Sequence, residues 1–250
     1  MTKRVHRKAT PLQSHGGSHA KSYGRSKSGI LCSFTHPVFL EPEYSRDETW
    51  SETNRKRLER KWGGKEAFDA QKKRHQLKER GREVGIQHFN LDRKASNTLK
   101  SHRLVQWVTK NYGCAKSEAL YDVLNVEHFV NGKKLNDAKM LLECAKKISD
   151  GVIDLEKAEK FLASDEGEKE IVLAKKALDR LGIHSIPNFV IGGKEVLSGA
   201  VHWKELVGAF RRIERTGLGA PENAFATILG IPEEIITQTT LDPTKYAATV

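Results

Sequence analysis

The sequence predicts an α/β fold in which a long series of helices precedes a strand–turn–strand–helix element. Phe189 to Ile191 is a β-branched and aromatic run, and Glu195 to Leu197 can return antiparallel to it. Gly192 and Gly193 between the two runs can take positive φ, so these residues predict a hairpin. Amphipathic segments with helical spacing stand on both sides of the hairpin. A short apolar run near residue 38 predicts one further strand.

The N-terminal part of the chain differs in composition from the rest. Residues 1–30 are rich in Lys, Arg, Ser, Gly and His, so we expect them to form a disordered basic arm. Seven Lys or Arg and no acidic residue precede Glu41, so most of the net charge of +11 lies in the arm. The arm resembles a mitochondrial transit peptide in composition, and a solvated tail is the alternative. The first strand is expected within residues 30–40, and Pro42 is expected to stop it from continuing.

The middle of the chain predicts a helical segment at about 51–181. Its predicted helices are 51–62, closed by Gly63 and Gly64; 65–84, interrupted at Gly81; 96–112, capped by Ser96 or Asn97; 118–130; 136–148; 155–163; and 168–181, ended by Gly182. After the hairpin, Ser198 and Gly199 are expected to cap a helix that begins near Ala200. Residues 218–250 form a tail that prolines interrupt, with short helices predicted at 222–229 and 233–238.

Composition and cysteine usage exclude several classes of protein. The chain is 38% hydrophobic and 30% charged, and it contains neither an apolar run of membrane-spanning length nor a signal-peptide core. We therefore expect no membrane association and a cytoplasmic location, with the mitochondrion as the alternative. Cys32, Cys114 and Cys144 form no CxxC motif and no metal-ligand spacing, so no metal site is expected. Cys114 and Cys144 are expected to be buried free thiols.

Two patches of the sequence are similar to one known family. Ile186 and Pro187 stand before the hairpin in G-I-x-x-I-P-x-F-V-I, followed by S-G-A, and N-T-x-x-x-H-R-L begins at Asn97. With H-P-V-F-L-E-P-E from His36 and L-E-R-K-W-G-G, they resemble the DsbA-like thioredoxin-fold family, in particular its FrnE-like branch, over about residues 34–215. The resemblance implies a thioredoxin-like sheet with a large helical insert, in a domain of residues 31–217, and an ancestry among thiol-disulfide oxidoreductases.

The resemblance also implies a substrate cleft. In the family, a cis-proline ends a loop that faces the redox centre, and Ile186 and Pro187 occupy the matching positions. His184 belongs to the same loop. Asn97, His102 and Arg103 belong to the second patch. Arg103 is a candidate to bind an anionic substrate group, with His102 helping to position it; the alternative is that one of the two packs or caps and the other is solvated.

The chain departs from the family at the redox centre. There, the first strand leads into a CxxC motif at a helix N-terminus, where the helix dipole and free N–H groups lower a thiol pKa. This sequence contains no such motif. Cys32 is a weak candidate nucleophile, because Pro37 and the apolar run after it leave no helix start beneath the thiol. We therefore expect a truncated or degenerate member that lacks the first strand and helix, unless the arm or a second copy in a homodimer supplies the strand.

Three functional classes follow from these observations. The first is a thiol-disulfide oxidoreductase acting on a thiol or disulfide substrate, which the missing CxxC opposes. The second is a glutathione-linked enzyme, because hydroxychromene-carboxylate isomerases and kappa-class glutathione transferases share this fold and bind glutathione near the cis-proline. The third is a non-catalytic binding module with a basic arm. Nucleic acid ranks last as a partner, because charge alone supports it.

Overall fold

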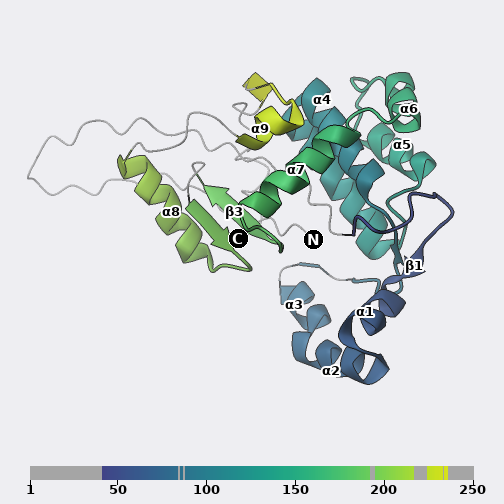
Figure 1. Cartoon of the computed structure of the whole chain (residues 1–250), viewed down its shortest axis with the longest axis vertical. Helices are drawn as coiled ribbons and strands as arrows, with labels where there is room; N and C mark the ends of the chain where they lie inside the picture. The colour runs from purple at the N-terminus through teal and green to yellow at the C-terminus, as the bar shows by residue number, and fades with distance from the viewer. Residues whose placement is uncertain are drawn as a thin grey trace, which may run out of the picture. The chain divides into compact units, whose positions relative to one another are not determined.

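The computed structural model describes residues 41–83, 85–86, 88–191, 195–216, 224–232 and 234–235. The predicted strand at 30–40, Cys32 and most of the predicted helix at 233–238 lie outside these residues. The chain divides into two compact units, one of residues 37–175 and one whose described part begins at residue 176 (Figure 1).

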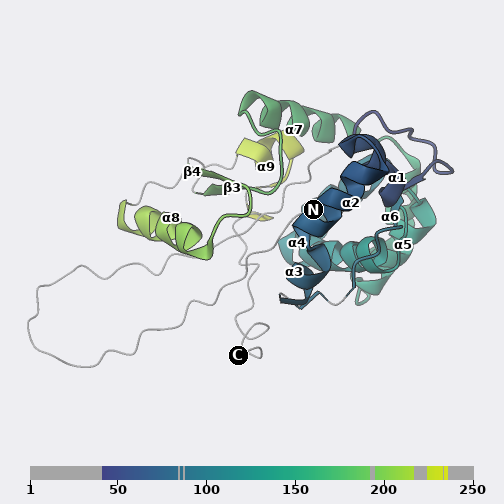
Figure 2. The ribbon, with the colours of Figure 1, turned by 90° about the horizontal axis from the view of Figure 1, so that it is seen from below.

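The first unit is almost entirely helical. Its elements are β1 (Glu52–Thr53), α1 (Asn54–Trp62), α2 (Lys65–His75), α3 (Leu77–Glu83), β2 (Lys94–Ala95), α4 (Leu99–Asn125), the π-helical turn η1 (Val126–Val130), α5 (Ala138–Lys147), α6 (Leu155–Ala163) and α7 (Glu168–Arg180), whose last residues belong to the second unit. The short strands β1 and β2 pair antiparallel, with Glu52 opposite Ala95. Figures 1 and 2 both show α5 beside α4.

The core of this unit lies between α4, α5 and α6. Leu104, Val108 and Leu120 of α4 and Leu141 of α5 are completely buried, and Phe161 of α6 packs against the same cluster. Leu104 and Val108 are separated by one helical turn, so they lie on the same side of α4. This spacing explains why the apolar side of the predicted helix at 96–112 is the buried side.

The start of α1 differs from the predicted start at residue 51. Glu52 and Thr53 are extended and pair with β2, and the Thr53 Oγ1 accepts a hydrogen bond from the Lys56 N–H at 3.3 Å. Thr53 is therefore the N-cap, and the helix begins at Asn54. At the other end, Gly63 takes the left-handed conformation with φ of 87°, which confirms the predicted stop.

The predicted interruption of the next helix at Gly81 is wrong. The chain breaks at Gln76, which has a left-handed conformation with φ of 45°, and this residue separates α2 from α3. Gly81 lies inside α3, at a position where a larger residue would collide with its neighbours. A Cβ atom at this position would lie 3.0 Å from the Phe89 ring and 3.0 Å from the Ile86 carbonyl oxygen.

The remaining helices follow the sequence pattern with shifted ends. Gly113 interrupts α4 with φ of 86° and ψ of 169°, next to the predicted end at 112. The chain returns to helix at once, whereas the prediction placed the next start at 118. Asp137 caps α5, which begins two residues later than predicted, and α6 has the predicted bounds.

The second unit contains the predicted hairpin. Strands β3 (Asn188–Ile191) and β4 (Glu195–Ser198) pair antiparallel, with Phe189 opposite Leu197. The helix after them, α8 (Trp203–Thr216), starts later than the predicted Ala200. Ser198 ends β4, and the His202 Nδ1 accepts the Lys204 N–H at 3.3 Å, so Ser198 and Gly199 are not the cap.

Helix α8 packs on one face of the hairpin. Leu206 and Ala209 of α8 are buried against Ile191 of β3, and partly buried apolar residues surround them. Phe189, Leu197, Val201, Phe210 and Ile213 make up this surrounding layer. Helix α9 (Ala224–Leu229) matches the predicted helix at 222–229, of which the first two residues lie outside the described part of the chain. Within that part, the strands form two separate two-stranded sheets.

Candidate functional site

The Pro187 loop connects α7 to β3. Gly182 ends α7 with φ of 71°, and the Ile183 N–H donates to the Leu178 carbonyl oxygen at 2.9 Å, which turns the chain towards the hairpin. The Ile186–Pro187 peptide bond is cis. The Pro187 carbonyl oxygen accepts the Gly199 N–H at 2.8 Å, so the loop is tied to the residue that follows β4.

The side chains of this loop are accessible. Ile186 and Pro187 are half-buried, and His184 is exposed, with 68% of its side-chain surface accessible. The His184 Nδ1 lies 3.5 Å from the Asp179 Oδ1, at the C-terminal end of α7. Three of the candidate cleft residues are thus neighbours in one short, partly open loop.

Asn97 has a structural role at the start of α4. Its side chain is 2% exposed; its Oδ1 accepts the Leu99 N–H at 2.9 Å, and its Nδ2 donates to the Tyr44 carbonyl oxygen at 2.6 Å. Asn97 precedes the N-cap, Thr98, so α4 begins at Leu99 and not at the predicted residue 96. The Asn97 amide satisfies the first N–H group of α4 and fastens the segment around Tyr44 to the helix. One turn further on, the His102 Nε2 and the Thr98 Oγ1 are 3.1 Å apart.

Arg103 is buried and bound to main-chain carbonyls. Its Nε donates to the Glu166 carbonyl oxygen at 2.7 Å, and its Nη2 donates to the carbonyl oxygens of Phe161, at 3.1 Å, and Ser164. The guanidinium also lies over the Phe161 ring, 5.0 Å from the centroid. Burial lowers the pKa of Arg103. This placement favours the packing role for Arg103 that the sequence offered as the alternative to anion binding.

The two described cysteines are buried and are not joined in a disulfide. Cys114 is 2% exposed and Cys144 is 1% exposed. The Cys144 Sγ lies 3.4 Å from the Met140 Sδ, and burial raises the pKa of the Cys144 thiol to about 11. Because the thiolate is the attacking species in disulfide exchange, this environment suppresses the reactivity of Cys144.

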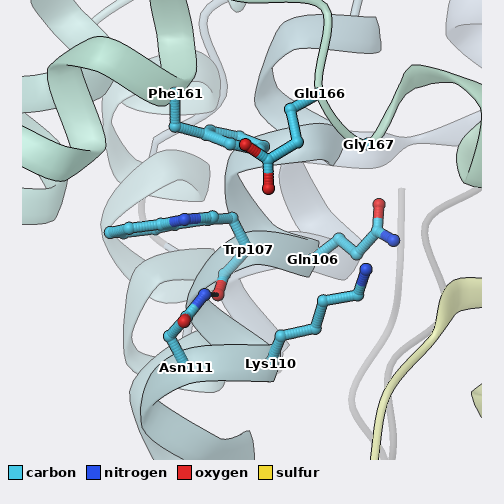
Figure 3. A pocket seen from close by; sticks show the side chains of 7 residues that line it. All are labelled: Gln106, Trp107, Lys110, Asn111, Phe161, Glu166 and Gly167. Carbon is cyan, nitrogen blue, oxygen red and sulfur yellow. Dashed lines mark hydrogen bonds between the residues drawn. The ribbon is translucent and has the colours of Figure 1, made fainter.

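A small pocket lies in the first unit beside α4. It has a volume of about 170 Å³ and is lined by residues of α4, of α6 and of the turn before α7 (Figure 3). The lining residues are Gln106, Trp107, Lys110, Asn111, Phe161, Glu166 and Gly167. Its wall is aromatic, because Trp107 and Phe161 stack with centroids 5.6 Å apart. The sequence did not single out this pocket, because its residues come from three separate segments.

A second polar cluster that the sequence did not indicate surrounds His128 of η1. The Arg93 Nε lies 3.2 Å from the His128 Nε2, and the His128 Nδ1 lies 2.8 Å from the Lys133 carbonyl oxygen. Because Nε of arginine can only donate, the His128 Nε2 must accept, and the proton of a neutral ring is on Nδ1. The Arg93 guanidinium also lies 4.8 Å from the centroid of the Phe129 ring.

The predicted cleft residues fall into two groups. His184, Ile186 and Pro187 belong to the second unit, and Asn97, His102 and Arg103 belong to the first. Across the described ranges, no cluster of three or more His, Cys, Asp or Glu side chains is placed to hold a metal ion. No helix in those ranges is both long enough and apolar enough to cross a membrane.

Comparison with known proteins agrees with this architecture. The model of the DSBA-like thioredoxin domain family matches residues 56–211. A crystal structure of a probable DsbA oxidoreductase from Streptomyces coelicolor is similar, with a TM-score of 0.60 and 22% identity over 74% of this chain and 76% of that one. No curated protein matches significantly. The family match extends from α1 to α8 and includes both patches noted in the sequence, and the chain therefore belongs to the DSBA-like thioredoxin domain family.

Proposed function

We propose that this chain is a FrnE-like member of the family that has retained the scaffold for a thiol or disulfide substrate but is impaired in thiol-disulfide exchange. The proposal rests on the positions and the burial of the cysteines. The sequence contains no CxxC motif, and both described thiols are at least 98% buried. Exchange requires a thiolate that can reach a disulfide sulfur, and neither Cys114 nor Cys144 meets this requirement.

The Pro187 loop supports the retained part of the proposal. Its half-buried Ile186 and Pro187 lie at the start of the hairpin, and the hydrogen bond to Gly199 fixes the loop backbone. In this proposal, Ile186 and Pro187 offer the surface against which an extended substrate would lie, and His184 lies at its margin. No catalytic step is assigned to these three residues.

The test is reduction of insulin by the full 250-residue chain in the presence of dithiothreitol, with thioredoxin as the positive control. We expect the rate to equal that of dithiothreitol alone, and the variants Cys32→Ser and Cys144→Ala to behave in the same way. Turnover by the unmodified chain would overturn the proposed impairment. If Cys32→Ser then abolished that turnover, the reacting thiol would be Cys32.

A further inference from the structure

The charges around the pocket in the first unit have opposite signs at its two ends. In Figure 3 the Glu166 carboxylate points into the space between Phe161 and Gln106, and the Lys110 ammonium approaches the Gln106 side chain from the other end. Within the described part of the chain, Glu166 has no ion-pair partner. Lys110 lies 3.5 Å from the Glu170 Oε1, a long contact that leaves donors of the ammonium for a second acceptor.

The main chain holds Glu166 in this position. Its carbonyl oxygen accepts the Arg103 Nε–H at 2.7 Å, and its N–H donates to the Ser164 Oγ at 3.2 Å. Arg103 is itself buried in the core of the unit. The exposed Glu166 carboxylate therefore projects from a stretch of main chain that is held in place by hydrogen bonds.

The walls of the pocket add neutral hydrogen-bonding groups to these charges. Gln106 is 3% exposed and borders the pocket with its amide. The Asn111 Nδ2 donates to the Trp107 carbonyl oxygen at 2.8 Å, which holds the Asn111 side chain against α4. Trp107 and Phe161 stack on each other, and the Arg103 guanidinium lies over the Phe161 ring.

We propose that this pocket binds a small zwitterionic α-amino acid, with its ammonium group at Glu166 and its carboxylate at Lys110. The Lys110 ammonium would repel a simple amine, and the Glu166 carboxylate would repel a simple carboxylate. A ligand that carries both charges can form an ion pair with each of the two residues. The pocket is small, with a volume of about 170 Å³. This space favours glycine, alanine or serine over an amino acid with an aromatic side chain.

The experiment is a titration of the 15N-labelled full chain with L-alanine, followed by the Trp107 indole and the Gln106 and Asn111 side-chain amide resonances. We expect saturable shifts at these groups. Acetate, methylamine and L-tryptophan, each at the same ionic strength, are expected to give none. Equal shifts from acetate or methylamine, or the absence of a saturable shift with L-alanine, would overturn the proposal.

Two variants remove one charge each without changing the core. Glu166→Gln and Lys110→Met are expected to weaken L-alanine binding about tenfold or more, because each removes a charge-assisted hydrogen bond. The matched controls are Glu159→Gln and Lys160→Met on the exposed side of α6, which should bind as the unmodified chain does. Unchanged binding in Glu166→Gln would also overturn the proposal, provided that its backbone spectrum matches that of the unmodified chain.

Discussion

The guanidinium of Arg103 lies 5.0 Å from the centroid of the Phe161 ring and donates to the Phe161 carbonyl oxygen at 3.1 Å. The same residue of α6 thus offers Arg103 both a ring face and a main-chain acceptor. With the bonds to Ser164 and Glu166, this cation holds the C-terminal end of α6 and the turn before α7 against α4.

Replacement of Arg103 by Met should lower the free energy of unfolding by about 2 kcal/mol or more, because buried carbonyl oxygens lose a charged donor. Urea denaturation followed by circular dichroism measures this change. Lys160→Met removes an exposed cation from α6 and should change stability by less than about 0.5 kcal/mol. An Arg103→Met variant as stable as the control would contradict the anchoring role.

His128 should make stability depend on pH. Burial lowers the His128 pKa from 6.5 to about 4, and Arg93 adds to this effect. Between these values the unfolded chain binds a proton that the folded chain does not, so this contribution to stability is lost as pH falls from 6.5 to 4. It is complete above pH 6.5, and the loss amounts to roughly 3 kcal/mol at most.

The measurement is the urea midpoint as a function of pH for the unmodified chain and for His128→Gln. The variant should lose stability less steeply between pH 6.5 and 4, whatever its stability at neutral pH. His88 is exposed, so His88→Gln serves as the control and should keep the original slope. Parallel curves for His128→Gln and the unmodified chain would refute the assignment.

Replacing Gly132 and Gly151 by alanine tests the energetic cost of backbone strain separately from the cost of a steric clash. Gly132 and Gly151 have φ of 75° and 76°, but only at Gly132 would a Cβ atom meet a neighbour, the Asn90 Nδ2 at 2.7 Å. Gly151→Ala should therefore cost only the left-handed strain, about 1 kcal/mol. Gly132→Ala should cost more, because Asn90 must also give up the hydrogen bond that its Oδ1 accepts from the Asp92 N–H. Thermal unfolding compares the two variants, and an equal loss in both would rule out the conflict with Asn90.

Thiol accessibility is a direct check on the two described cysteines. In a Cys32→Ser variant, Ellman's reagent should not react with the native protein at pH 8. Cys114 and Cys144 are buried, and the raised Cys144 pKa of about 11 leaves roughly one thiol in a thousand ionised at that pH. In denaturant both thiols should react. Fast reaction of the native variant would show that one of them is accessible.

Elements with strong local signals were predictable from the sequence. Asp154 caps α6 through its Oδ1, which accepts the Lys157 N–H at 3.0 Å, and the apolar residues of α6 recur on one side, so both bounds agree with the prediction. The hairpin was equally clear, because a β-branched and aromatic run and a second short run flank a Gly-Gly pair. The starts of α1 and α8 were misplaced because pairing with distant or preceding strands draws Thr53 and Ser198 into extended structure.

The candidate site was harder to predict, since its residues depend on remote partners. The acceptors of Arg103 lie 58 to 63 residues further along the chain, and the Tyr44 carbonyl lies 53 residues before Asn97. No local pattern reveals such contacts. The pocket has the same origin, because Glu166 and Gly167 reach α4 only through the packing of α6. By contrast, the neighbouring positions of His184, Ile186 and Pro187 follow directly from their order in the sequence.

Asn97 and Arg103 give the N-T-x-x-x-H-R-L pattern a structural role in this chain. Both side chains bind main-chain groups of the first unit, so they stabilise the packing of its helices. Neither aspartate, which lacks the donor, nor glutamine, which is one methylene longer, can replace Asn97 at both of its bonds. Loss of either side chain would therefore disturb the first unit, whether or not the chain exchanges disulfides.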